Sequence, residues 1–227
     1  LSDAAWRMVI KGMDSVWFWM WTGIGDWRGY LNSTLDYWPA TAELTEEMRP
    51  VREGLGDLLL HSQMAHSGVA VFYSVASALS GGLEEGRTFA QPEMTHLTWT
   101  RLTYEVGQDF RYVTGAMVKR GALDPREFRV LLLPMAQAIS PEEAAAIRRY
   151  VEAGGVVIAD VRPGLFDGHC KPVAPGVLDD LFGIRRTGRG KSARGALALK
   201  VTLGGKALDV GLKDAITDPG VEAAGAQ

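Results

Sequence analysis

Residues 129–160 read RVLLLPMAQAISPEEAAAIRRYVEAGGVVIAD, and this stretch decides the fold. The apolar runs Phe128–Leu133 and Val156–Asp160 predict two strands. Between them, Ser140-Pro141-Glu142-Glu143 predicts a helix start, because it offers a serine N-cap, a proline at the first helical position and a glutamate three residues after the cap. A strand, a helix and a strand in this order are typical of a parallel sheet with crossover helices.

The same alternation begins upstream of this stretch. Val69–Tyr73 predicts a buried strand and Asp109–Thr114 a further strand, and residues 93–106 predict a helix between them. The order strand, helix, strand, turn, strand, helix, strand favours an α/β fold with a flavodoxin-like, doubly wound parallel sheet. We expect this domain to span residues 65–187.

The first 64 residues have a different pattern. Residues 4–11 predict a helix, and Val16–Trp21 is a short run that is apolar on both faces, as expected of a buried strand. Residues 22–40 predict a long loop, and a second helix is expected over residues 41–62, with a kink or first turn at Pro50.

The last segment, residues 188–227, contains basic and glycine-rich stretches. One hairpin is expected there, with Leu197–Leu203 paired to Leu208–Leu212 across Gly204-Gly205. We expect this segment to be the start of a further, truncated β-rich region. Because the first residue is Leu1 and already lies at a predicted helix, we also expect the chain to be a piece of a longer protein.

The composition excludes several classes of function. A net charge of −3 and the lack of a dense Lys/Arg run argue against nucleic-acid binding. The longest apolar runs are far shorter than the ~20 residues that a membrane span needs. The single cysteine, Cys170, excludes an internal disulfide and a cysteine-based zinc site. We expect no metal and no cofactor. The cellular location is not determined by the sequence.

An ordered series of short motifs points to a known family. In chain order these are Ala5-Trp6-Arg7, Gly12–Val16, Gly54–Leu59, Val69–Ser74, Arg129–Pro134 and Tyr150–Val157. The series resembles glycoside hydrolase family 42 and related β-galactosidase-like enzymes, at the junction of the catalytic barrel and the trimerisation domain. The resemblance covers about residues 4–186. It implies that residues 1–64 are the last βα unit of a (β/α)8 barrel.

The resemblance implies a retaining glycoside hydrolase whose two catalytic glutamates lie about 5 Å apart at the ends of earlier barrel strands. If residues 16–21 are the eighth strand, both glutamates precede Leu1, and this chain has no catalytic residues of its own. We expect it to supply part of a galactoside site and a noncatalytic domain that assembles a homo-oligomer.

The tryptophans near the first predicted strand are the candidate sugar contacts. The carboxyl end of a barrel strand faces the active site, which would place Trp21 where a sugar ring can stack. The resemblance implies a tryptophan at this place, and Asp26, Trp27 and Arg28 in the following loop are candidate contacts at the rim. Packing of these side chains in a core is the alternative.

Other functions remain open at this point. Ser74–Gly82 follows the first strand of the second domain, where flavodoxin-like folds bind phosphate or flavin, although an ordinary connector is favoured. A class I glutamine amidotransferase shares the sheet but needs a cysteine after a strand, and Leu133-Pro134-Met135-Ala136 has none. The polar loop from Asp160 to Cys170 has no metal-ligand spacing. A pure protein-interaction domain is the third possibility.

Overall fold

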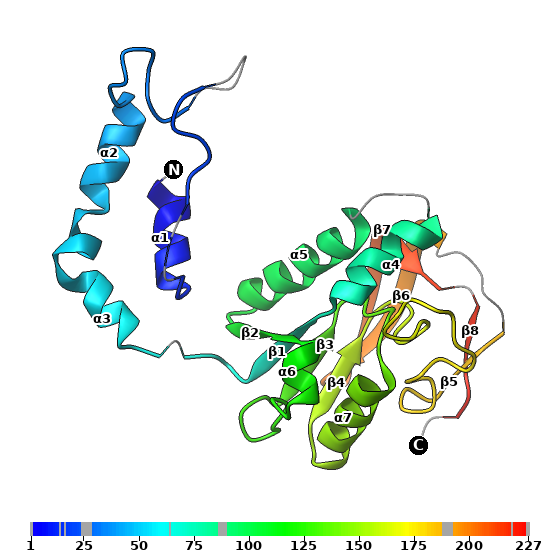
Figure 1. Ribbon diagram of the computed structural model, residues 1–227. Helices are drawn as coiled ribbons and strands as arrows, with labels where there is room; N and C mark the ends of the chain where they lie inside the picture. The colour runs from blue at the N-terminus through cyan, green and yellow to red at the C-terminus, as the bar shows by residue number, and fades with distance from the viewer. Residues whose placement is uncertain are drawn as a thin grey trace. The chain divides into compact units, whose positions relative to one another are not determined.

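The computed structural model describes residues 2–13, 15, 17–23, 29–63, 65–85, 90–187, 193–218 and 220–225. The chain divides into two compact units, Leu1–Ala65 and His66–Gln227, and each is treated by itself (Figure 1). Within the described part of the chain, no helix is long and apolar enough to cross a membrane.

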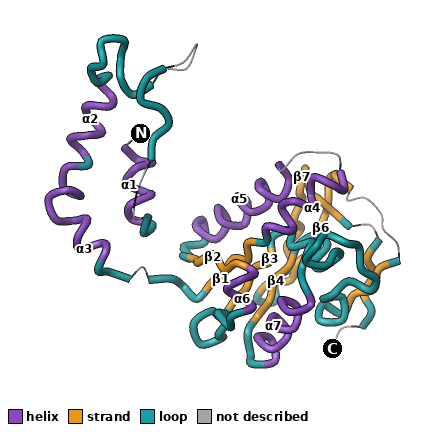
Figure 2. Tube along the Cα trace, viewed as in Figure 1, coloured by secondary structure: helices purple, strands orange, loops and turns teal. Residues whose placement is uncertain are grey.

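The second unit is built on a four-stranded parallel sheet. Its strands are β1 (Val69–Tyr73), β2 (Phe110–Thr114), β3 (Val130–Leu133) and β4 (Val156–Ala159), in the spatial order β2-β1-β3-β4 (Figure 2). In register, Val69 lies beside Phe110 on one side and Val130 on the other. This order is that of a flavodoxin-like sheet, with its switch point between β1 and β3. All four strands were predicted from the sequence, and the predicted fold class is confirmed.

Helices cover both faces of this sheet. Helices α4 (Val75–Glu85) and α5 (Ala90–Glu105) join β1 to β2 and pack against each other. Helices α6 (Gly115–Lys119) and α7 (Pro141–Glu152) follow β2 and β3 and also pack together. Right-handed crossovers place the two pairs on opposite faces, as Figure 1 shows. The core lies between the sheet and the second pair, with the apolar residues Phe72, Val113, Leu131, Leu133, Ile139 and Ile147 almost fully buried.

Helix α7 forms as its sequence predicts. Ser140 accepts from the Glu143 backbone N–H, and the Glu143 side chain accepts from the Ser140 N–H, which completes a capping box. At the other end, Gly154 has φ +97°, a conformation that favours glycine. Tyr150 is buried and its hydroxyl donates to the Phe128 carbonyl at 2.9 Å, so the helix is fixed to the start of β3.

The C-terminal segment is β-rich. Strand β5 (Ile184–Arg186) pairs antiparallel with β8 (Val221–Ala223), and the hairpin of β6 (Ala193–Leu203) and β7 (Lys206–Thr217) lies between them in sequence. The predicted hairpin is therefore confirmed and is longer than expected. One face of the hairpin carries three apolar cross-strand pairs, Leu197–Leu212, Leu199–Val210 and Val201–Leu208.

The first unit is helical with an extended segment. It contains α1 (Ser2–Ile10), α2 (Pro39–Glu47), the π-helical turn η1 (Val51–Leu55) and α3 (Gly56–Leu60). The helix predicted over residues 41–62 is thus interrupted, by a turn at Met48 and by Gly54 with φ +134°. Pro50 has helical dihedral angles and directly precedes η1, close to the expected irregularity.

The strand predicted at Val16–Trp21 is not formed, and this prediction is wrong for the described residues 17–21. Trp17 and Trp19 are 91% and 82% exposed rather than buried. A central parallel strand needs a hydrogen-bonded neighbour on each side, and no strand pairs with these residues in the described part of the chain. Among the residues described after this run, isolated bridges join Thr22 to Leu31 and Leu31 to Tyr37.

A second correction concerns Ser74–Gly82, which was expected to be a connector or a phosphate-binding loop. Residues 75–85 are helical, and Ser74 acts as the cap, because its Oγ accepts from the Ser77 N–H at 3.0 Å. The serines that suggested a loop bind the chain after β3 instead, since the hydroxyls of Ser74 and Ser77 both donate to the Ala138 carbonyl.

Candidate functional site

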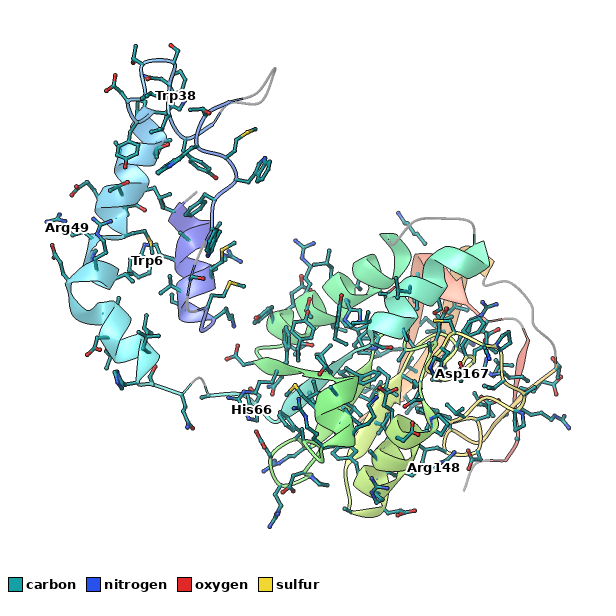
Figure 3. All side chains as sticks on the ribbon, in the orientation of Figure 1. Trp6, Trp38, Arg49, His66, Arg148 and Asp167 are labelled. Carbon is teal, nitrogen blue, oxygen red and sulfur yellow. The ribbon has the colours of Figure 1, made fainter. Side chains whose placement is uncertain are left out.

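The aromatic segment of the first unit contains one predicted sugar contact, Trp21. Its side chain is 63% exposed, and its ring centroid lies 6.3 Å from that of Tyr37. Figure 3 shows the side chains between α1 and α2, with Trp38 at the start of α2. An exposed indole beside a phenol ring offers flat apolar surface with polar edges.

The backbone around Trp21 is held by a compact turn. The Leu31 N–H donates to the Trp21 carbonyl at 2.9 Å, and Gly29 approaches so closely that a Cβ there would meet the Trp21 oxygen. Asn32 organises the turn that follows, since its Oδ1 accepts from the N–H groups of Thr34 and Asp36. The side chain of Trp21 therefore projects from a defined backbone.

The other three predicted contacts, Asp26, Trp27 and Arg28, lie outside the described residues. Among the neighbouring tryptophans, Trp17 donates from Nε1 to Ser15 Oγ at 3.2 Å and is otherwise exposed. Within this chain, Trp17, Trp19 and Trp21 are exposed.

The carboxyl edge of the parallel sheet is the second candidate site. A pocket of about 420 Å³ lies there, formed by the ends of β1 and β2, the start of α7 and the loop after β4. Flavodoxin-like folds bind their ligands at this edge, at the switch point between β1 and β3. The polar side chains around it include Ser74, Thr114, Lys119, Ser140, Glu142, Glu143 and His169.

A carboxylate of the chain itself occupies part of this switch point. Glu143 Oε2 accepts from the Ser140 N–H at 2.8 Å, and Oε1 lies 3.8 Å from Lys119 Nζ. The Glu143 carboxylate also touches Gly115, where an added Cβ would clash with it. The N-terminal ends of three helices here are already capped by side chains: α4 by Ser74, α6 by Thr114 and α7 by Ser140. Their backbone N–H groups are therefore not free to bind a phosphate, and the switch point is poorly suited to one.

The turn after β3 corresponds to the place of the nucleophile in an amidotransferase. Met135 stands there with φ +42°, and its N–H donates to Asp160 Oδ1 at 2.6 Å. Asp160 also accepts from Trp99 Nε1 at 2.9 Å, and burial raises the pKa of this carboxyl. Cys170 lies elsewhere, with its Sγ 3.3 Å from the Ala76 carbonyl, and burial raises the pKa of its thiol as well. These features are opposite to those of an activated nucleophile.

The loop after β4, predicted to be polar, supports the structure. Asp167 Oδ1 accepts from the N–H groups of His169 and Lys171, and these bonds lower the pKa of the Asp167 carboxyl. In the ranges that the structure describes, no three His, Cys, Asp or Glu side chains are grouped as a metal site requires. The loop thus has the geometry of a hydrogen-bonded turn.

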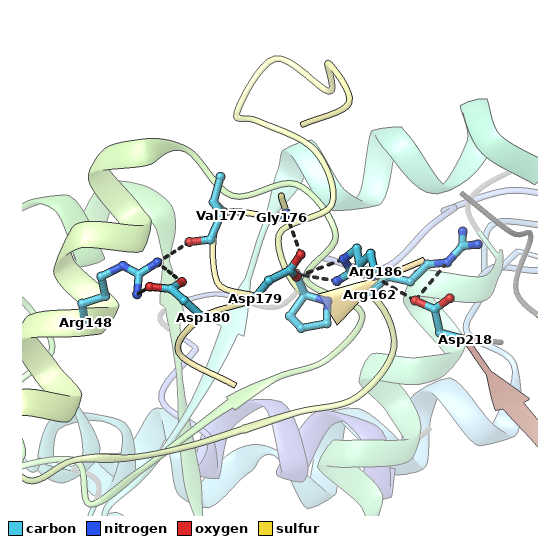
Figure 4. A network of polar contacts seen from close by, with 9 residues as sticks. Arg148, Arg162, Gly176, Val177, Asp179, Asp180, Arg186 and Asp218 are labelled. Atoms are coloured by element: carbon cyan, nitrogen blue, oxygen red, sulfur yellow. Dashed lines mark hydrogen bonds and ion pairs between the residues drawn. The ribbon is translucent and has the colours of Figure 1, made fainter. Parts of the chain in front are cut away.

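Sequence reasoning missed a buried ionic network in the second unit. Arg186 Nε lies 3.0 Å from Asp179 Oδ1, and its Nη1 lies 2.9 Å from Asp218 Oδ2 (Figure 4). Arg162 joins the network through Asp218, and its side chain is 1% exposed. The Arg186 side chain is only 10% exposed, and through Asp218 it contacts the C-terminal β-region.

His66, the first residue of the second unit, is largely buried. Its side chain is 16% exposed and its ring stacks on Phe128 with centroids 4.9 Å apart. His61 is exposed beside Asp57 of α3.

Comparisons with known proteins bear on both units. Residues 111–219 match the family model of the β-galactosidase trimerisation domain, which confirms the resemblance stated from the sequence. No curated protein matches the chain.

Solved β-galactosidases share the fold over nearly the whole chain. A catalytic mutant of a glycoside hydrolase family 42 enzyme from G. stearothermophilus has 15% identity and a TM-score of 0.67, covering 97% of this chain and 32% of that chain. The enzyme from Rahnella sp. R3 has 14% identity and a TM-score of 0.63, with 99% and 34% covered. The enzyme from Marinomonas ef1 has 18% identity and a TM-score of 0.57, with 96% and 34% covered. The chain thus spans about a third of the length of these enzymes.

Proposed function

We propose that the chain is part of a β-galactosidase-like glycoside hydrolase, in which it supplies one wall of the sugar site and a noncatalytic assembly domain. The observation that carries the proposal is the match of residues 111–219 to the β-galactosidase trimerisation domain. The flavodoxin-like sheet and the likeness to family 42 enzymes over 97% of the chain support it.

The proposal divides the chain into three parts. Residues 1–64 are the carboxy-terminal end of a (β/α)8 barrel, and residues 65–187 are the flavodoxin-like assembly domain. Residues 188–227 are the β-rich region that follows. This region contacts the assembly domain through the pairing of β5 with β8 and through the ion pair between Asp218 and Arg186.

The sugar contacts in this proposal are Trp21, Asp26, Trp27 and Arg28. Trp21 is supported by its exposure and by Tyr37 beside it, which together offer a surface for the apolar face of a galactoside. The exposed Trp17 and Trp19 would pack against neighbouring strands of the completed barrel. The catalytic glutamates of the longer protein would be supplied by earlier barrel strands, and the chain itself would need no cofactor.

The assembly role makes the longer protein a homo-oligomer, since the matched domain is described as a trimerisation domain. The flavin or phosphate module is not favoured, because Ser74–Gly82 is a capped helix and Glu143 occupies part of the switch point. A pure interaction domain would share the assembly role and would differ only in lacking the upstream barrel.

Extension of the gene upstream of Leu1 tests the proposal. We expect a barrel with two strand-end glutamates, hydrolysis of nitrophenyl β-galactoside by the longer protein, and no hydrolysis by residues 1–227 alone. A matched variant of the longer protein with either glutamate changed to glutamine should lose turnover. An upstream sequence without such glutamates would refute the glycoside hydrolase assignment.

A further inference from the structure

The hairpin of β6 and β7 is amphipathic. Its side chains alternate between two faces, as successive side chains of a strand do. One face carries small and polar side chains, with Lys200 opposite Asp209 and Thr202 opposite Ala207. The other face carries six aliphatic side chains from the two strands: Leu197, Leu199, Val201, Leu208, Val210 and Leu212. This pattern is typical of a sheet that buries one face against a partner.

The aliphatic face of the hairpin is largely open in the described part of the chain. Leu199, Leu208, Val210 and Leu212 are 37–45% exposed. Among the described residues, none from β6 or β7 belongs to the apolar core of the second unit. An isolated two-stranded hairpin is marginally stable at best in water, so a hairpin of this length needs another apolar surface on that face.

A second open apolar face lies on the edge strand β4. Val157 and Ala159 pack against the core, so Val156 and Ile158 point to the opposite face of the sheet. These two side chains are 52% and 42% exposed. Helices α4 and α5 connect β1 to β2 and therefore lie toward the other end of the sheet from β4. Because parallel strands are usually buried on both faces, β4 also lacks a cover.

A second copy of the chain is the occupant that the observations favour. The match to the β-galactosidase trimerisation domain runs to residue 219 and includes β4 and both strands of the hairpin. A ring of three copies needs a heterologous contact, in which one face of each copy meets a different face of the next. The second unit offers two such faces, and both are aliphatic. Strands β6 and β7 contain 11 and 12 residues, close to the roughly 20–30 residues that one side of a stable interface uses.

We propose that the aliphatic face of the hairpin in one copy packs on Val156 and Ile158 of β4 in the next copy, and that this contact closes the oligomer. The inference rests on the assembly role proposed above and names the surfaces that carry it. Contact between the two faces removes aliphatic surface from water, which drives the association. Lys200 and Asp209 stay on the outer face of the hairpin, where water solvates them.

Sedimentation velocity of the full chain and its variants tests this contact. Val210→Glu puts a charge at the centre of the hairpin face, and Ile158→Lys puts one on β4. Each should weaken association about 30-fold, as expected of a hot-spot residue, because the contact would bury an unpaired charge. The matched controls are Thr202→Glu, on the opposite face of the hairpin, and Leu97→Lys, at an exposed site on α5. Both controls should change association less than about 3-fold.

The double variant Val210→Glu/Ile158→Lys separates a lost contact from a folding defect. The glutamate of one copy would meet the lysine of the next, so the double variant should associate more tightly than either single variant. Urea unfolding at a concentration where the chain is monomeric should give midpoints close to that of the unaltered chain, because both side chains are already exposed.

Three results would overturn the inference, and they can be told apart. If the unaltered chain stays a monomer at every concentration, the proposed assembly role fails together with this contact. If the unaltered chain assembles but the single variants behave like their controls, or the double variant is weaker than both, this contact alone is refuted. A loss of monomer stability in the single variants that the double variant restores would show that the two faces pack within one chain.

Discussion

Nη1 of Arg186 donates a hydrogen bond of 2.9 Å to Oδ2 of Asp218, joining β5 to the segment after β7. Both side chains are nearly buried, at 10% and 13% exposure. Arg162, itself buried, lies 3.7 Å from the same Asp218 oxygen. The carboxylate of Asp218 is therefore the group that ties the C-terminal β-region to the flavodoxin-like sheet.

Asp218→Ala is expected to destabilise the second unit strongly. The substitution takes one carboxylate away from two buried arginines, although Arg186 keeps Asp179, and removal of one partner of a buried ion pair typically costs about 3–5 kcal/mol. Urea unfolding followed by circular dichroism measures this change. The control is Glu222→Ala, which removes the exposed partner of Arg185 and should change stability little. Equal effects of the two substitutions would show that the buried network does not hold this region.

Asp160 gives a prediction about pH. Burial raises the pKa of its carboxyl in the folded protein, so protonation of Asp160 favours folding. Its contribution is fully present below the unfolded pKa of 3.8 and is lost as the pH rises through the raised folded pKa. The unfolding free energy of the protein relative to that of Asp160→Asn should therefore increase as the pH falls from 7 toward about 4.

The control for this pH series is Asp180→Asn. Arg148 donates to Asp180 at 2.6 Å and holds the pKa of that carboxyl below its usual value, so the relative stability should change in the opposite direction. Parallel pH dependences for the two variants would contradict the assignment of opposite shifts.

Gly155 precedes β4 and allows a close approach. A Cβ at this position would lie 2.3 Å from the Tyr150 ring, which is buried and cannot move aside easily. Gly155→Ala is expected to cost about 1–3 kcal/mol by overpacking. Gly211→Ala, in open space on β7, should be close to neutral. A comparison of the two thermal midpoints checks this, and a tolerated Gly155→Ala would mean that the ring is free to shift.

Tyr150 should also behave unusually in alkali. Burial raises the pKa of its phenol to about 12, although a backbone hydrogen bond partly offsets the effect. Ultraviolet titrations of the protein and of Tyr150→Phe should therefore coincide up to about pH 10 and differ by one phenolate near pH 12, where Tyr150 ionises. The same variant should lose about 0.5–1.5 kcal/mol of stability, because the Phe128 carbonyl loses its donor. A difference between the two titrations near pH 10 would contradict the buried position of the ring.

The parts of the fold predicted from sequence are those with a local signal. Strands β1 and β3 are continuous apolar runs, and α7 begins with a complete capping box, so neighbouring residues were sufficient. Val16–Trp21 gave the same apolar signal, yet strand formation depends on partners that the run does not encode. The serines and glycines of Ser74–Gly82 have low helix propensity, but contacts with Ala138 fix the helix start.

The candidate site was predictable only in part. Trp21 was identified from the carboxyl end of an apolar run, and its exposure agrees with a contact role that remains a proposal. Tyr37 beside it could not be foreseen, because the turn at Asn32 that brings the two rings together depends on hydrogen bonds across the loop. Arg186 and Asp218 are 32 residues apart in the sequence. They meet because β5 pairs with β8, a long-range contact that no local sequence pattern reveals.

The central claim is that this chain carries an assembly domain. Sedimentation velocity of residues 1–227 over a wide concentration range tests it most directly. The account predicts association with increasing concentration toward a mass three times the 24.6 kDa of one chain. A single species of 24.6 kDa at every concentration would contradict it.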